Sequence, residues 1–226
     1  MTIEAVAHFR SPVEGKFGLP RQSGLASSLR GEIHFTPAYR NPDAVKGLEG
    51  FSRIWLIWAF DLNPQSRSLT VRPPRLGGNS RMGVFATRSP FRPNGLGLSC
   101  VELLEVDFDC PGAPVLRVAG ADLADGTAII DIKPYLSYAD SFPDAMCGFA
   151  PEAPQARLEV CLLPDAQGIF DPGQEEALKE ILSLDPRPAY HSDAQRIYGI
   201  RFEGRDVHFR VEGPRLTVLD AVLPQK

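Results

Sequence analysis

Six arginines and no acidic residue lie between Leu62 and Val101, although the chain as a whole carries a formal net charge of −4. An arginine guanidinium stays charged near neutral pH, and its planar set of donors matches phosphate or carboxylate. Glycines and prolines between the arginines indicate that loops carry them. The segment therefore predicts a site for an anionic partner; the alternative is a group of arginines that only solvates the surface.

A second candidate site is the segment Asp122–Tyr135, which reads DLADGTAIIDIKPY. Its Asp-Gly pair indicates a turn between two apolar runs. Three polar or aromatic side chains then alternate along a predicted strand and share one face: Asp131, Lys133 and Tyr135. They are candidate catalytic groups, with Asp122 a weaker one, and the alternative is an ordinary surface ion pair.

The sequence lacks the motifs of several common enzyme classes. A P-loop, a complete GxGxxG, an HExxH and a GxSxG are all absent. The four histidines form no local ligand pair, and the four cysteines show no CxxC spacing. We expect reduced thiols and no metal site.

No apolar run approaches the roughly 20 residues that a membrane span requires. The first residues, MTIEAVAHFRSP, lack the basic and then apolar order of a signal peptide. The sequence therefore predicts a cytoplasmic protein that does not enter a membrane.

The elements that must position these residues are predicted to be mainly strands. Short apolar or alternating runs are separated by turn residues, which favours a compact β-barrel or a sandwich. The predicted strands are Ile3–Arg10, Leu29–Thr36, Phe51–Phe60, Met82–Thr87, Leu98–Asp107, Val115–Ala121 and Ala128–Ile132. A short helix over Pro42–Leu48, capped by Asn41, lies between them.

A change in composition over Ser141–Pro154 predicts a linker and thus two domains, 1–142 and 150–226. The second is predicted to be a small α+β domain. Its helix spans Pro172–Leu184, with Asp171 as the cap and acidic residues in the first turn. Its predicted strands are Ala156–Leu163, a hairpin of Arg196–Gly204 with Asp206–Glu212, and Leu216–Leu223.

Four motifs resemble those of one known family. The sequence MGVFATRSPFRPNGLGLS is followed by DLADGTAIIDIKPY, with TVRPPRLGGN upstream and GLPRQSG near the start. These motifs resemble the TrmO family of tRNA methyltransferases, also called YaeB, with its TsaA-like domain. The resemblance covers nearly the whole chain, and DPRPAY near residue 185 resembles the family's second domain.

The resemblance implies a compact β-barrel that binds S-adenosylmethionine (SAM) in the first domain, and a tRNA-binding or accessory domain in the second. It implies a homodimer with the cofactor near the subunit interface. The implied reaction is N6-methylation of threonylcarbamoyladenosine next to the anticodon of threonine tRNA.

Carried over by position, the family's cofactor contacts fall on four parts of this chain. They are Pro20, Arg21 and Gln22; Asp61 and Leu62; Arg88 and Leu98; and Asp125, Gly126, Thr127 and Ala128.

The chain departs from the family pattern at three places. Asp61-Leu62 stands where His-Gln is common, Gly95 where RPNPIG has proline, and Ala128 where DGTP has proline. The first departure puts side-chain contacts at Asp61 and Leu62 in doubt, and the other two alter the stiffness of loops.

Arg72, Arg75, Arg81 and Arg92 are predicted to bind the anticodon-stem backbone of the RNA and its carboxylate-bearing modification. Arg187 and Tyr190 are predicted to clamp or stack on a loop nucleotide, because unpaired bases favour aromatic platforms; the alternative is a turn packed between the domains. Two other readings of the function stay open: an RNA-binding β module without catalysis, and a SAM-dependent methyltransferase of another RNA or a small molecule.

Overall fold

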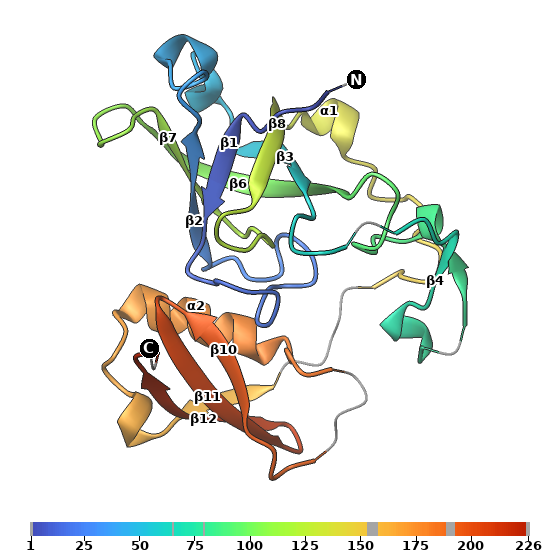
Figure 1. Ribbon diagram of the computed structural model, residues 1–226, viewed down its shortest axis with the longest axis vertical. Helices are drawn as coiled ribbons and strands as arrows, with labels where there is room; N and C mark the ends of the chain where they lie inside the picture. The colour runs from blue at the N-terminus through green and yellow to red at the C-terminus, as the bar shows by residue number, and fades with distance from the viewer. Residues whose placement is uncertain (1, 65, 79, 153–157, 189–192, 225–226) are drawn as a thin grey trace.

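The computed structural model describes residues 2–64, 66–78, 80–152, 158–188 and 193–224. Its first part is a closed barrel of six antiparallel strands, as the sequence predicted (Figure 1). The order around the barrel is β1-β2-β7-β6-β3-β8, and β1 pairs with both β2 and β8. The strands are β1 (Ala7–Arg10), β2 (Arg30–Phe35), β3 (Arg53–Ala59), β6 (Leu96–Asp107), β7 (Val115–Ala119) and β8 (Ala128–Pro134).

Alternating burial along β3 explains how the barrel fills its interior. Ile54, Leu56 and Trp58 are buried, while the residues between them face outward. Because side chains alternate across a strand, every second residue of β3 joins the core. The same core contains Phe9 of β1, Ile129 of β8 and further aliphatic residues of β6 and β7.

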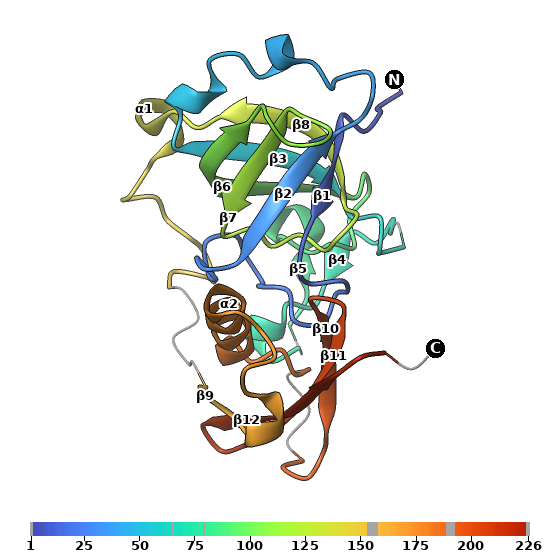
Figure 2. The same cartoon turned by 90° about the vertical axis from the view of Figure 1, so that its left-hand side faces the viewer.

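The arginine-rich segment forms an arm beside the barrel and not a strand of it (Figures 1 and 2). It contains the short pair β4 (Thr70–Val71) and β5 (Met82–Gly83), with 3-10 turns at Pro74–Leu76 and Val84–Ala86. The strand predicted over Met82–Thr87 is therefore wrong after Gly83. The local apolar residues close a turn there because the chain must bend back towards β6.

The C-terminal part is a helix packed on a four-stranded sheet of order β10-β11-β12-β9. The helix α2 (Pro172–Ser183) begins at Asp171, whose side chain forms a capping box with Gln174. Its buried face, Ala177, Leu178, Ile181 and Leu182, packs in the core of this part. The strands are β9 (Glu159–Leu162), β10 (Tyr198–Phe202), β11 (Arg205–Glu212) and β12 (Arg215–Val222), and a 3-10 turn at Pro164–Ala166 lies between β9 and α2.

Two other predictions differ from the structure in detail, and one element was not predicted. The first strand begins at Ala7, and the short helix after Asn41 is two separate 3-10 turns, Pro42–Ala44 and Leu48–Gly50. Gly47, with φ of +86°, lies between the turns and interrupts the helix. The unpredicted element is a short helix, α1 (Ser137–Asp140), which follows β8.

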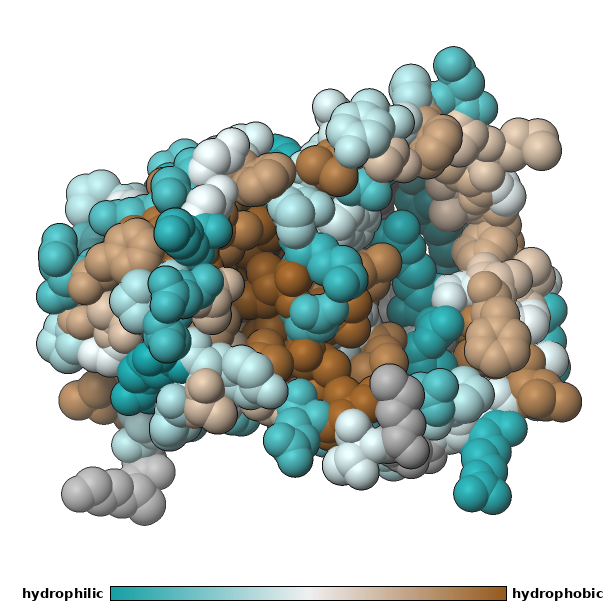
Figure 3. All heavy atoms as spheres, turned by 90° about the horizontal axis from the view of Figure 1, so that it is seen from above, coloured by the Kyte–Doolittle hydropathy of each residue, from teal (hydrophilic) through white to brown (hydrophobic). Residues whose placement is uncertain are grey.

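Seen from above, hydrophobic residues form a band across the barrel between more hydrophilic flanks (Figure 3). None of the helices in the described ranges is both long and apolar enough to cross a membrane.

Candidate functional site

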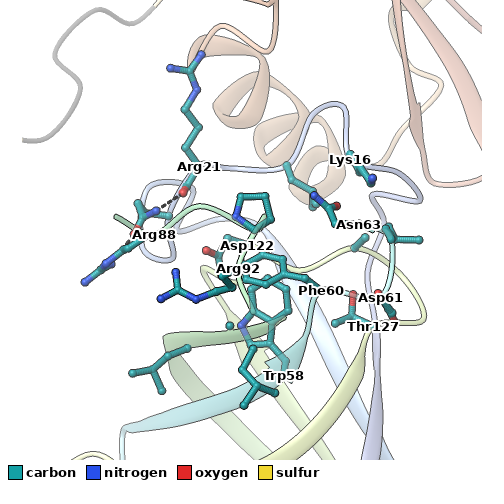
Figure 4. A pocket seen from close by; sticks show the side chains of 18 of the residues that line it. Lys16, Arg21, Trp58, Phe60, Asp61, Asn63, Arg88, Arg92, Asp122 and Thr127 are labelled. Atoms are coloured by element: carbon teal, nitrogen blue, oxygen red, sulfur yellow. Dashed lines mark hydrogen bonds between the residues drawn. The ribbon is translucent and has the colours of Figure 1, made fainter. Parts of the chain in front are cut away.

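A cavity of about 540 Å³, here called the first cavity, lies at one end of the barrel. The antiparallel order brings four chain segments to this end: the end of β3, the start of β6, the residues after β7 and the residues before β8. Trp58 and Phe60, Leu96–Leu98, Asp122 and Thr127 therefore line one cavity (Figure 4). The loop that carries Lys16–Gln22 and the arm that carries Arg88 and Arg92 close its sides.

Two side chains that line the first cavity, Trp58 and Asp122, are connected through the buried hydroxyl of Ser99. Trp58 Nε1 donates to Ser99 Oγ at 2.9 Å, and Ser99 Oγ donates to Asp122 Oδ1 at 2.5 Å. Burial raises the pKa of Asp122, although the Ser99 hydroxyl and the Arg88 charge act in the opposite direction. Asp122 is therefore a carboxyl group whose proton affinity is higher than usual, in a wall shared with aromatic rings.

Gly97 allows Trp58 to take this position. The two residues are cross-strand partners on β6 and β3. A Cβ atom at residue 97 would lie 2.3 Å from the Trp58 ring, far inside van der Waals contact. The Trp58 ring also meets the edge of Phe60, with centroids 4.3 Å apart. The close approach at Gly97 thus shapes the apolar floor of the cavity.

The cations around the first cavity differ in how they are held. Arg88 Nη1 donates to Gln22 Oε1, which joins the arm to the loop opposite. Arg92 donates to the carbonyl oxygens of Thr87 and Ser89 at 3.1 and 3.3 Å. The Arg21 side chain points away from the cavity towards α2 (Figure 4), where Nη2 lies 3.5 Å from the Asp185 carbonyl oxygen.

Eight of the eleven predicted cofactor residues line the first cavity. They are Pro20, Arg21, Gln22, Asp61, Leu62, Arg88, Leu98 and Thr127. Asp125, Gly126 and Ala128 are not part of its lining. The Asp125 carboxylate instead accepts from Ser11 N at 3.1 Å and from Arg10 Nη1 at 3.4 Å, so it holds the start of the neighbouring loop.

Two of the departures from the family pattern meet in the structure. Ala128 N donates to Asp61 Oδ2 at 3.4 Å. A proline at residue 128 has no N–H and could not make this bond. The carboxylate at residue 61 and the non-proline residue at 128 therefore form one local unit.

The predicted catalytic residues Asp131, Lys133 and Tyr135 share one face of β8, but that face is the outside of the barrel. Lys133 Nζ lies 2.9 Å from Asp131 Oδ2, and the Tyr135 ring lies 6.1 Å from the ring of Trp55. None of the three lines the first cavity. A bulge where β8 pairs with β3, between Ile129 and Asp131, shifts the alternation of β8. Ile129 and Ile132 therefore pack in the barrel core, and the polar residues face outward.

A second cavity of about 680 Å³ adjoins the first. Gln22, Thr87, Arg88 and Pro90 line both. The second cavity adds Arg72 and Arg81 of the arm, the hydroxyl groups of Ser66, Ser68 and Ser89, and the rings of Phe91 and Phe149. Its described lining contains three arginines and no acidic residue, which makes it suitable for an anion.

The remaining predicted RNA-binding residues lie elsewhere. Arg75 Nη2 donates to the Glu152 carbonyl oxygen at 2.5 Å, outside the lining of the second cavity. Arg187 forms a two-pronged pair with Asp185 at 2.8 and 2.9 Å, so its guanidinium is already bound within the turn after α2. Tyr190 lies outside the described residues.

Reasoning from the sequence missed Trp58, Ser99 and Lys16 as parts of the site. Trp58 and Ser99 lie in apolar strand patterns. The register of β3 on β6 sets Trp58 against Gly97, and hydrogen bonds through Ser99 connect Trp58 to Asp122, which follows β7. The described residues contain no group of three or more His, Cys, Asp or Glu side chains that could hold a metal ion.

Comparison with known proteins matches both parts of the chain. The family model of the tRNA-methyltransferase O N-terminal domain matches residues 8–141, and that of the TrmO C-terminal domain matches residues 156–223. The tRNA (adenine(37)-N6)-methyltransferase of Escherichia coli is 42% identical over 217 residues, which cover 92% of each chain.

Two further similarities support the assignment. A probable S-adenosyl-L-methionine-binding protein of Methanothermobacter thermautotrophicus is 43% identical over 139 residues, 62% of this chain and 93% of that protein. A crystal structure of TrmO from Pseudomonas aeruginosa superposes with a TM-score of 0.78 at 33% identity, covering 98% of this chain and 97% of the other. The chain therefore belongs to the TrmO family of tRNA methyltransferases.

Proposed function

We propose that this chain, a SAM-dependent tRNA (adenine-N6)-methyltransferase, methylates N6-threonylcarbamoyladenosine next to the anticodon of threonine tRNA. The observation that carries the proposal is the adjacency of the two cavities. The first is lined by carboxylates as well as aromatic rings, and the second has arginines and no acidic residue in its described lining. The name of the Escherichia coli relative places its target at adenine 37.

The side chains of the first cavity fit SAM. Trp58 and Phe60 offer apolar surface to an adenine ring, and Asp61 and Asp122 offer negative charge to the cationic sulfonium and amino groups. Lys16, Arg88 and Arg92 can balance its carboxylate. When bound there, SAM supplies an electrophilic methyl group.

The second cavity fits the RNA. Arg72, Arg81 and Arg88 can hold phosphates or the threonyl carboxylate, and Phe91 and Phe149 can stack on an unpaired base. Arg75 and Arg92 stay predictions as backbone contacts. We leave Arg187 out of the RNA site because Asp185 already binds its guanidinium.

The attacking nitrogen is weakly nucleophilic because the carbamoyl group delocalises its lone pair, so alignment between the two cavities supplies much of the acceleration. The reaction forms an N–CH₃ bond, breaks an S–CH₃ bond and releases the N–H proton. We assign Asp122 as the proton acceptor, since it lines the first cavity and its pKa is raised. Asp131, Lys133 and Tyr135 face the outside of the barrel and are not given this role.

We also propose that the chain forms a homodimer through the outer face of β3, β6 and β8. That face carries Leu98, which is 59% exposed, beside Trp55 and Tyr135, and Tyr138 of α1 is 85% exposed. Exposed apolar surface of this kind is typical of protein interfaces. The face borders the first cavity, because Trp55 and Leu98 belong to both. Light scattering should give twice the chain mass, and Tyr138→Arg should lower it.

The substrate is tested by digesting threonine tRNA to nucleosides and measuring their masses after incubation with the protein and SAM. We expect one additional methyl group on threonylcarbamoyladenosine, and none on tRNA that lacks the threonylcarbamoyl group. Methyl transfer to the unmodified tRNA would contradict the substrate assignment. Because tRNA is the substrate, we propose that the protein acts in the cytoplasm.

A further inference from the structure

The loop of residues 11–29, here called the bridging loop, belongs to both parts of the molecule. It lies between the barrel and the C-terminal part in two perpendicular views (Figures 1 and 2). One side of it, from Lys16 to Gln22, lines the first cavity. Its other side has no part in the barrel core: Val13, Ala26 and Leu29 are buried in the core built around α2 and β10–β12.

Main-chain contacts fix the first half of the bridging loop to β10. Val13 forms an isolated bridge with Phe202, Glu14 N donates to the Arg201 carbonyl oxygen at 3.3 Å, and Glu203 N donates to the Pro12 carbonyl oxygen at 2.8 Å. Gly18, with φ of +91°, approaches so closely that a Cβ atom there would lie 3.2 Å from Ile200.

One carboxylate of α2 fixes the second half. Glu180 Oε2 accepts from Ser28 N at 2.8 Å and from the Ser28 hydroxyl, and Glu180 Oε1 lies 3.3 Å from Ser27 Oγ. Burial opposes ionisation of Glu180, but the hydrogen bonds from Ser28 and Ser27 together outweigh it and lower the pKa of the carboxyl. The loop is thus held at both ends by the C-terminal part, with the cavity-lining residues between.

We infer that the C-terminal part holds one side of the cofactor site in place by fixing the bridging loop. Glu180 is then a positioning residue for SAM although it does not line the cavity. A loop that is already ordered loses less conformational freedom when a ligand binds. Anchoring the bridging loop therefore raises the affinity of the cavity for SAM. The inference rests on the placement of SAM in the first cavity.

The test compares Glu180→Ala with Glu176→Ala, an equal loss of charge on the same helix at an exposed position. Affinity for S-adenosylhomocysteine is measured by calorimetry without tRNA, and hydrogen exchange of residues 13–29 is followed in the ligand-free protein. We expect about a tenfold weaker affinity and faster exchange in the loop for Glu180→Ala. Glu176→Ala should change neither measurement.

A loop that exchanges faster in Glu180→Ala while the affinity stays within twofold of Glu176→Ala would overturn the inference. If Glu180→Ala does not fold, Ser28→Ala, which removes only one hydroxyl group, serves the same comparison with a smaller expected loss. Arg88→Ala tests the placement of SAM in the first cavity separately from the role of Glu180. If Arg88→Ala leaves the affinity unchanged, the placement of SAM is wrong. If only Arg88→Ala weakens binding, the role of Glu180 fails.

Discussion

The two cavities are built from different kinds of structure although they share a wall. The floor of the first is formed by strand ends, where the register of β3 on β6 fixes Trp58 against Gly97, while loops and the arm close its sides. The second is formed by two short strands, turns and the arm, with cations and hydroxyl groups. A rigid site suits one invariant small molecule, and a charged set of loops suits a flexible polynucleotide.

The largest effect is expected from Asp122→Asn, which keeps the shape of the first cavity and removes the proton acceptor. We expect kcat to fall about 10²- to 10⁴-fold, with a much smaller loss of affinity for S-adenosylhomocysteine, whose amino group loses one facing charge. Single-turnover methylation of threonine tRNA measures the first quantity and calorimetry the second. Asp109→Asn, an exposed position on a loop outside both cavities, is the control. Normal turnover in Asp122→Asn would remove Asp122 from the chemistry.

The double variant Arg72→Ala/Arg81→Ala should weaken the RNA side alone. We expect KM for tRNA to rise roughly 10- to 100-fold, since two charge-assisted contacts are lost, while cofactor affinity stays unchanged. The log–log salt dependence of tRNA binding should become shallower by about 0.7–0.9 per lost phosphate contact. Arg67→Ala, in the same segment but outside both cavities, is the matched control. An equal loss in Arg67→Ala would mean that only overall charge matters.

The raised pKa of Asp122 predicts a pH dependence with a definite sign. The folded protein holds this proton more tightly than the unfolded chain, so ionisation of Asp122 costs stability as the pH rises through its folded pKa. The unfolding free energy of the wild type, measured relative to that of Asp122→Asn, should therefore fall as the pH rises. The rate of methyl transfer should rise over the same window. Denaturant unfolding at several pH values checks the sign, and a difference that is flat with pH would contradict it.

The smallest effect is expected from Ala128→Pro, which removes the donor to Asp61 at the mouth of the first cavity. Because the bond is long and Asp61 is exposed, we expect only about a twofold change in cofactor affinity. Ala128→Ser keeps the N–H and should match the wild type. Identical affinities for the proline and serine variants would show that the two departures are independent.

The strands and the main helix could be predicted from the sequence, but their pairing could not. A run of apolar residues over Phe51–Phe60 marked β3, and Asp171 with the proline after it marked the start of α2. The barrel order depends on contacts between segments far apart in the chain, such as Trp58 with Gly97. Composition found the arginines, but it could not distinguish Arg72 and Arg81 in the cavity from Arg75 outside it, because their partners come from other segments.

The bridging loop shows the same limit. Its apolar residues Val13, Ala26 and Leu29 looked like parts of the first domain, and the structure buries them in the core of the second. No local pattern specifies such a partner, since the buried area becomes available only when α2 and β10 have packed.

The central claim is that the first cavity binds the cofactor and the second binds the RNA. A crystal structure of the protein with S-adenosylhomocysteine and a short anticodon-stem RNA tests it most directly. We predict the cofactor product in the first cavity, beside Trp58 and Asp122, and the phosphates or carboxylate of the RNA at Arg72 and Arg81 in the second. Cofactor density outside the first cavity, or RNA bound on a face remote from the arm, would contradict the account.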